Sequence, residues 1–150
     1  MADARATGFD AGSVDLFVSN NTLEHLPKST IADVFAEYRR LSTRSGVMSH
    51  YIDMTDHYAS FDRAITVYNF LRFSDRTWRV FNNDLQYQNR LRVSDFRHLH
   101  ADATWAIVEE RNETDASAFE RVPLAPRFSC YSREDCMVYA TWQVSQLASP

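Results

Sequence analysis

The sequence is poor in glycine and cysteine, and each shortage excludes a class of site. Its three glycines, at positions 8, 12 and 46, form no GxGxxG-like loop that could approach a phosphate or a cofactor closely. Cys130 and Cys136 are the only cysteines, which excludes a disulfide framework and a CxxC metal pair. We expect two buried or half-buried thiols.

Long apolar runs are absent as well. No run approaches the length of a membrane span, and the N-terminus has no apolar signal region, so we expect a cytoplasmic protein with no membrane partner. The 150 residues suffice for one domain with a core but not for two. The net charge of −4 argues against a nucleic-acid partner, and the excess of arginine over the single Lys28 indicates no function by itself.

A short apolar run at residues 14–18 predicts a buried strand. Its weak alternation is typical of a strand covered on both faces, as in a parallel sheet. Ser19, Asn20 and Asn21 follow at once and place three small polar side chains at the carboxyl end of this strand. Ligands of open parallel sheets bind outside such strand ends, so these three residues are the first candidate binding site.

A helix and a second strand follow in the pattern. Thr30, with Asp33 three residues on, indicates a helix cap. Apolar residues then recur at helical spacing as far as Leu41, and Gly46 supplies the stop. Residues 47–53 are predicted as a strand. This order, with short connections, is a βαβ unit with parallel pairing and a right-handed crossover.

The second half of the sequence is less regular. Residues 54–92 interleave aromatic and arginine side chains without glycine or proline, which favours a helical insert. This insert could pack as core and lid, cap an acceptor site, or stack a single-stranded nucleic acid, and the acidic net charge disfavours the last. Farther on, the pattern predicts a helix at 94–101, a strand at 105–110, a loop at 112–127 and a last strand at 137–144.

Residues 14–27 read VDLFVSNNTLEHLP and resemble the fourth strand and following loop of small class I S-adenosylmethionine-dependent methyltransferases of the type-11-like kind. That family often has an acidic residue, an apolar strand, a small polar residue and then Leu-Glu-His. Downstream, EYRRL at residues 37–41 resembles the family's helix ending in Arg-x-Leu. The Pro-Gly-Gly turn of the family is here Arg44-Ser45-Gly46, which departs from the pattern.

An Asp-Ala pair extends the resemblance upstream. Asp3-Ala4 lies twelve residues before Asp15, the spacing at which the family places such a pair after its third strand. The motifs match over residues 1–53, and beyond them only the order of elements agrees. The resemblance implies an α/β fold over residues 1–150: a partial Rossmann-like doubly wound sheet, the C-terminal half of the family's domain, with an antiparallel C-terminal strand pair.

The resemblance also implies S-adenosylmethionine as cofactor and methyl transfer to a small-molecule or glycan-like acceptor. Asp3 would accept a hydrogen bond from the adenine amino group, and the Ala4 N–H would donate to a ring nitrogen. Ser19, Asn20 and Asn21 would hold the aminopropyl part of the cofactor at the strand end. Plainer interpretations stay open, because Asp3 could be a solvated carboxylate and the two asparagines could be turn residues.

His25 is the one candidate catalytic residue, and three roles are open for it: a general base, an acceptor-binding group, or a structural histidine that holds the loop. Methyl transfer from a sulfonium needs a base only if the acceptor must lose a proton, since proximity and orientation can supply much of the acceleration. No metal site is predicted. His50 and His57 flank two aspartates but would need further ligands, and His98 and His100 are expected at the surface.

The family's first strand, its glycine-rich loop and its acidic ribose-binding residue would all precede residue 1. The chain would then be a truncated enzyme domain, a part completed by a partner, or a catalytically silent, oligomerising interaction module. In the complete fold the first strand lies beside the fourth, so residues 14–18 would here form an exposed apolar edge. Natural proteins pair or blunt such edges, which predicts a homo-oligomer through this strand.

Overall fold

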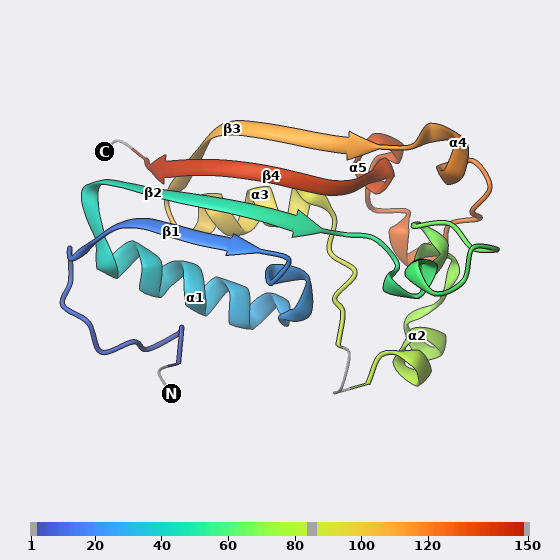
Figure 1. The fold of residues 1–150 in the computed structure, drawn as a ribbon, viewed down its shortest axis with the longest axis horizontal. Helices are drawn as coiled ribbons and strands as arrows, with labels where there is room; N and C mark the ends of the chain where they lie inside the picture. Colours follow the sequence, from blue (N-terminus) through green and yellow to red (C-terminus); the bar gives the residue numbers. More distant parts are fainter. Residues whose placement is uncertain (1–2, 84–86, 149–150) are drawn as a thin grey trace.

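The computed structural model describes residues 3–83 and 87–148 and shows one open sheet with helices packed against it (Figure 1). The sheet order is β1-β2-β4-β3, with β1 and β2 parallel and the other two pairs antiparallel. The strands are β1 (Val14–Asn20), β2 (Ser42–Asp53), β3 (Trp105–Thr114) and β4 (Val138–Leu147). This arrangement confirms the α/β class, the βαβ unit and the antiparallel C-terminal pair.

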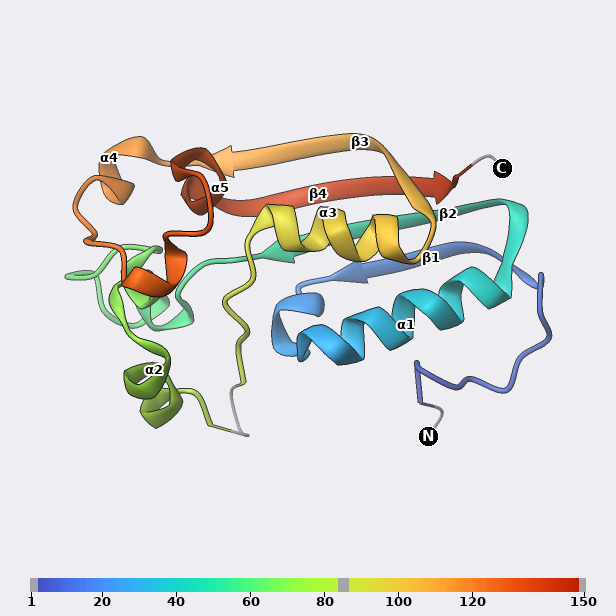
Figure 2. The ribbon, with the colours of Figure 1, turned by 180° about the vertical axis from the view of Figure 1, so that it is seen from behind.

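Two helices, α1 (Lys28–Leu41) and α3 (Val93–Asp102), cover one face of the sheet (Figure 2). Their apolar faces make the main core against the sheet, because Ile31, Val34 and Phe35 recur at helical spacing and are fully or almost fully buried. None of the described residues forms a helix on the opposite face. The described helices also lack the length and apolar character that crossing a membrane requires.

The prediction that β1 is covered on both faces is wrong. Phe17 is 6% exposed and packs in the main core, whereas Leu16 and Val18 are 58% and 64% exposed. The reason is the single helical layer: alternate side chains of a strand point to opposite faces, and only the face of Phe17 meets α1 and α3.

The ends of α1 also differ from the prediction. The helix begins at Lys28 with Pro27 as N-cap, so Thr30 lies inside the first turn and caps nothing. It ends at Leu41, and β2 begins at once with Ser42, which leaves Gly46 inside the strand. A Cβ atom at Gly46 would overlap Ser42 Oγ, so glycine allows a close approach within β2 and does not stop the helix.

Residues 54–92 are mostly irregular, which corrects the predicted helical insert. Apart from residues 84–86, which the structure does not describe, they hold one two-turn helix, α2 (Asp75–Phe81), and two short 3-10 turns, η2 (His57–Ser60) and η3 (Asn69–Arg72). Their aromatic residues follow no helical period and instead form a second core with the segment before β4. The members of this core include Tyr68, Phe70, Leu71, Trp78, Phe119, Phe128 and Cys136.

The C-terminal third also departs from the prediction in three places. The predicted loop at 112–127 contains the end of β3, the short helix α4 (Ala116–Phe119) and the start of the 3-10 turn η4 (Pro126–Phe128). A further short helix, α5 (Arg133–Met137), precedes β4. Cys136 is buried as expected, but Cys130 is exposed.

His100 is buried, not at the surface as predicted. It lies four residues after Phe96 on the inner side of α3, and its Nδ1 is 2.8 Å from the Phe96 carbonyl oxygen. Its ring packs edge-on against Phe35, with 4.7 Å between ring centroids. His98 points outward and is exposed, as expected.

Candidate functional site

The three polar residues at the end of β1 are held by the neighbouring strand. The Ser19 hydroxyl lies 2.7 Å from Nδ1 of His50 on β2, and the Asn21 N–H donates to the Tyr51 carbonyl at 3.1 Å. Asn21 has a φ of 49°, a left-handed conformation that asparagine tolerates, and this turns the chain at the strand end. Asn20 is exposed, and its side-chain amide bonds to none of the described residues.

His50, the partner of Ser19, is fully buried, and its burial together with the nearby His100 lowers its pKa from 6.5 to about 3. Between these values the unfolded chain binds a proton that the folded chain does not, so His50 lowers stability as pH falls below 6.5. We expect the cost of His50→Gln, measured by urea unfolding, to shrink by about 1.4 kcal/mol per pH unit below 6.5. The exposed His98→Gln should keep the wild-type pH slope, and parallel curves for wild type and His50→Gln would contradict the assignment.

Asp3 and Ala4 do not lie beside these strand-end residues in this structure. The N-terminal segment runs along the outer side of α1, where Asp3 shares a shallow depression with Asp33 and Glu37 (Figure 1). Both Asp3 carboxylate oxygens accept hydrogen bonds from Arg5, at 2.7 to 3.2 Å, and this lowers the pKa of Asp3 to about 2. An adenine amino group would have to replace the Arg5 guanidinium.

The 3-10 turn η1 (Leu23–His25) follows the end of β1 and carries a buried acid. Glu24 is 1% exposed, and neither of its carboxylate oxygens has a hydrogen-bond partner among the described residues. Burial, together with the charge of Asp53, raises the pKa of Glu24 to about 7. Asn89 fixes the turn, because its side-chain amide donates to the carbonyls of Leu23 and Leu26, both at 2.8 Å.

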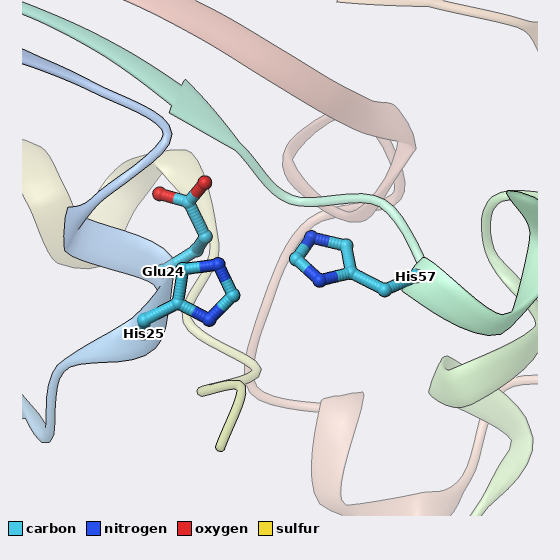
Figure 3. A group of neighbouring side chains, drawn as sticks. All are labelled: Glu24, His25 and His57. Atoms are coloured by element: carbon cyan, nitrogen blue, oxygen red, sulfur yellow. The ribbon is translucent and has the colours of Figure 1, made fainter. Parts of the chain in front are cut away.

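Two histidines lie next to Glu24. His25 comes from the same turn, and His57 begins η2 after the end of β2; their ring centroids are 5.0 Å apart (Figure 3). One ligand atom from each of Glu24, His25 and His57 can be chosen so that all three lie within 4.8 Å of one another. The three residues meet because β1 and β2 are parallel neighbours, so the chain segments that leave their carboxyl ends enter the same space.

The hydrogen bond that His25 makes decides which of its nitrogens is free. Nδ1 lies 2.8 Å from the Tyr87 carbonyl oxygen, which can only accept, so Nδ1 carries the proton. Nε2 is left with its lone pair. In His57, burial lowers the pKa and favours the neutral ring, and its Nε2 lies 3.8 Å from Asp53 Oδ2.

An apolar cavity of about 210 Å³ is lined by both chain neighbours of His57. Tyr58, Phe73, Trp78 and Phe81 line it, with Asp56 as one of its polar members. Asp56 and Tyr58 are the chain neighbours of His57, so the cavity and the histidine belong to the same end of the sheet. Its aromatic walls suit the apolar part of a small molecule.

The buried arginines of the insert are committed to the fold. Arg90 is 4% exposed and donates to the carbonyls of Phe70 and Phe73 and to Asp75. Arg92 is fully buried under Phe70. These two guanidinium groups are therefore not free to bind a phosphate or a sugar-like acceptor.

Sequence reasoning missed Glu24 and His57 as members of one cluster. Glu24 belongs to the Leu-Glu-His triplet, and the sequence pattern groups His57 only with its neighbours along the chain. The signal that could have joined them is the parallel pairing of the two strands, which brings both strand ends to the same place.

No protein-family model matches the sequence, and no curated protein matches it. Solved structures do match the fold. The PH0226 protein of Pyrococcus horikoshii OT3 aligns with a TM-score of 0.57 at 15% identity, over 97% of this chain and 57% of that one. A SAM-dependent methyltransferase of Methanosarcina mazei aligns with a TM-score of 0.56 at 10% identity, over 97% of this chain and 65% of that one.

A third match is the geranyl diphosphate C-methyltransferase of Streptomyces coelicolor A3(2), solved with Mg²⁺, geranyl diphosphate and S-adenosyl-L-homocysteine. It has a TM-score of 0.56 and 14% identity, over 97% of this chain and 50% of that one. The chain thus spans about half to two thirds of the length of these three proteins. It shares the Rossmann-like fold of SAM-dependent class I methyltransferases.

Proposed function

We propose that this chain forms the acceptor side of a methyltransferase that uses S-adenosylmethionine to methylate a small-molecule or glycan-like acceptor. One observation carries the proposal: the carboxyl ends of β1 and β2 bring the polar residues 19–21, the histidine pair and the aromatic cavity to one end of the sheet. Ligands of open α/β sheets bind at such ends. The methyltransferase fold of the structural matches supports the same proposal of methyl transfer.

The strand end fits the cofactor only in part. The exposed Asn20 amide, next to the anchored Ser19, can donate to and accept from the aminopropyl group. Asp3 would have to leave Arg5 and α1 before it could meet the adenine. The sequence holds no glycine-rich loop, so the remaining contacts of the cofactor would come from residues outside these 150.

The residues of this chain would act mainly on the acceptor. When bound, the cofactor supplies a methyl group on a sulfonium, which is a good leaving group. The aromatic cavity excludes water and orients the acceptor, which can provide much of the acceleration. His25, which follows the strand end and lies against His57, would act on the reacting part of the acceptor through its free Nε2, directly or through an ion that this nitrogen holds.

Binding of the cofactor tests this proposal. In a protein that also contains a glycine-rich first half, within the same chain or as a partner, Asn20→Ala should weaken S-adenosylmethionine binding about 5- to 30-fold, or about 1–2 kcal/mol. Asp3→Ala tests the adenine contact in the same way. Isothermal titration calorimetry measures the affinity of each variant. Asn112→Ala, exposed on β3 at the opposite edge of the sheet, is the matched control and should bind as wild type. Unchanged binding by both Asn20→Ala and Asp3→Ala would reject the assigned cofactor residues.

A second function, that of a catalytically silent oligomerising module, has its own supporting observation. Leu16, Val18 and Val108 are exposed apolar side chains on the two outer strands of the sheet. Both of these strands have one edge that pairs with none of the described residues. Exposed apolar edges of this kind favour pairing with another chain.

A further inference from the structure

We propose that Glu24, His25 and His57 bind a divalent transition-metal ion such as Zn²⁺, and that open coordination positions on this ion bind an oxygen of the acceptor. The sequence pattern predicts no metal site, because the chain neighbours of His57 do not supply enough ligands. The metal site itself stands on the geometry of these three residues. The acceptor's role in it rests on the proposed function.

Glu24 is buried without a hydrogen-bond partner for its carboxylate among the described residues. A carboxylate that is 99% buried with neither oxygen hydrogen-bonded is rare, since burying a charge without a partner is costly. No arginine or lysine among the described residues forms an ion pair with it. A cation at the cluster supplies the missing partner for both oxygens.

The histidines are prepared as ligands. A metal binds the unprotonated nitrogen of a neutral imidazole, and metal-bound histidines typically donate their other N–H to a carbonyl or a carboxylate. His25 already makes this outer contact, because its Nδ1–H donates to the Tyr87 carbonyl at 2.8 Å and leaves Nε2 free. Asp53, with Oδ2 at 3.8 Å from His57 Nε2, adds negative charge beside the cluster.

The ligand set indicates both the kind of metal and its role. Two imidazoles and one carboxylate suit zinc, iron and similar ions better than calcium or magnesium, which prefer oxygen ligands alone. Sites with three protein ligands keep a position open for water or substrate. Asp56 and Tyr58, the chain neighbours of His57, line the aromatic cavity, and we place the acceptor there with one oxygen directed to this position. A hydroxyl of the acceptor bound to the ion would lose its proton more readily.

Cobalt titration tests the site on the chain as it exists, without cofactor or acceptor. We expect chelator-stripped protein to bind one Co²⁺ with the visible absorption of a nitrogen- and oxygen-ligated ion, and Zn²⁺ to displace it in calorimetry. Glu24→Gln and His57→Asn should each weaken binding about 100-fold or more, beyond the 10- to 100-fold cost of losing an outer contact. His98→Asn, a matched exposed histidine, should bind as wild type.

The variants also separate a metal site from a structural role. His57 is half-buried, so His57→Asn should stay folded even if Glu24→Gln does not. Zn²⁺ should raise the melting temperature of wild type and of His98→Asn but not that of His57→Asn. Absence of Co²⁺ binding at 1:1 stoichiometry, or binding that His57→Asn leaves unchanged, would overturn the site.

A small oxygen chelator tests the open position. Acetohydroxamate should shift the absorption of the Co²⁺ protein, which shows that the ion accepts an external oxygen ligand. No shift would mean a closed coordination shell and would overturn the acceptor's role while leaving the metal site in place. Because neither measurement uses S-adenosylmethionine, failure of the cofactor test with Asn20→Ala would not be confused with failure here.

Discussion

We expect Val18→Lys to leave the chain folded while shifting any assembly toward monomer, and Phe17→Lys to unfold it. Val18 is 64% exposed on the open face of an edge strand, where an added charge opposes pairing with another chain. Phe17 is buried, with its ring stacked on Tyr38 at 4.4 Å between centroids. Removing such a ring costs about 3–5 kcal/mol before the burial of a charge is added, out of about 5–15 kcal/mol for a whole domain.

Sedimentation velocity at micromolar concentration, together with thermal unfolding, distinguishes these outcomes. Val108→Lys, on the outer strand β3 and 57% exposed in wild type, is the matched control for a charge on the other edge. If β1 is the interface, Val18→Lys changes the sedimentation coefficient and Val108→Lys does not. A stable wild-type monomer with slowly exchanging amides along residues 14–18 would reject assembly through this edge.

The fold could be predicted as far as local patterns reach. The apolar run of β1 and the helical spacing of Ile31, Val34 and Phe35 are local features, and they identified the βαβ unit correctly. The position of Gly46 shows the limit, because its need for space depends on Ser42 folding back against it within β2. Likewise, only one face of β1 is buried, because the described helices cover only that face of the sheet. The residues of the strand do not show which faces the helices will cover.

The candidate site shows the same limit more sharply. Ser19 and Asn20 are the last two residues of β1 and Asn21 follows it, so all three do lie at the strand end. Glu24 and His57 meet only through the parallel pairing of β1 and β2, so no spacing along the chain reveals them. His100 could have been predicted as buried from its position four residues after Phe96, which places both on one side of α3.

Residue types alone do not predict how the side chains of the insert at residues 54–92 are used. Its arginines and aromatic rings suggested an acceptor-binding cap, but the structure divides them into two groups. Arg90 lies between Trp78 and Phe128, with 5.3 and 5.4 Å from its guanidinium carbon to the ring centroids. Tyr58, Phe73 and Phe81 line the cavity. Arg90 thus contacts two residues of the cavity wall, Phe73 and Trp78, and its guanidinium is engaged within the fold.

We therefore expect Arg90→Ala to destabilise the chain by about 1–3 kcal/mol, because the Phe73 carbonyl loses this donor, whereas the Phe70 carbonyl still accepts from the Phe73 N–H. Its guanidinium also bonds Asp75 at the start of α2, so the loss should loosen this helix and Trp78 with it. Arg90→Met keeps the apolar stem and should fall between the alanine variant and wild type.

Urea unfolding measures the loss of stability, and hydrogen exchange locates it. Amides in α2 and η3 should exchange faster in Arg90→Ala, while those of β2 and β4 keep their protection, because the main core does not contain Arg90. Arg79→Ala, exposed on α2, is the matched control and should change stability by less than about 0.5 kcal/mol. If Arg90→Ala were as stable as Arg79→Ala, the Phe73 carbonyl would find water or another donor, and the cavity walls would not depend on this guanidinium.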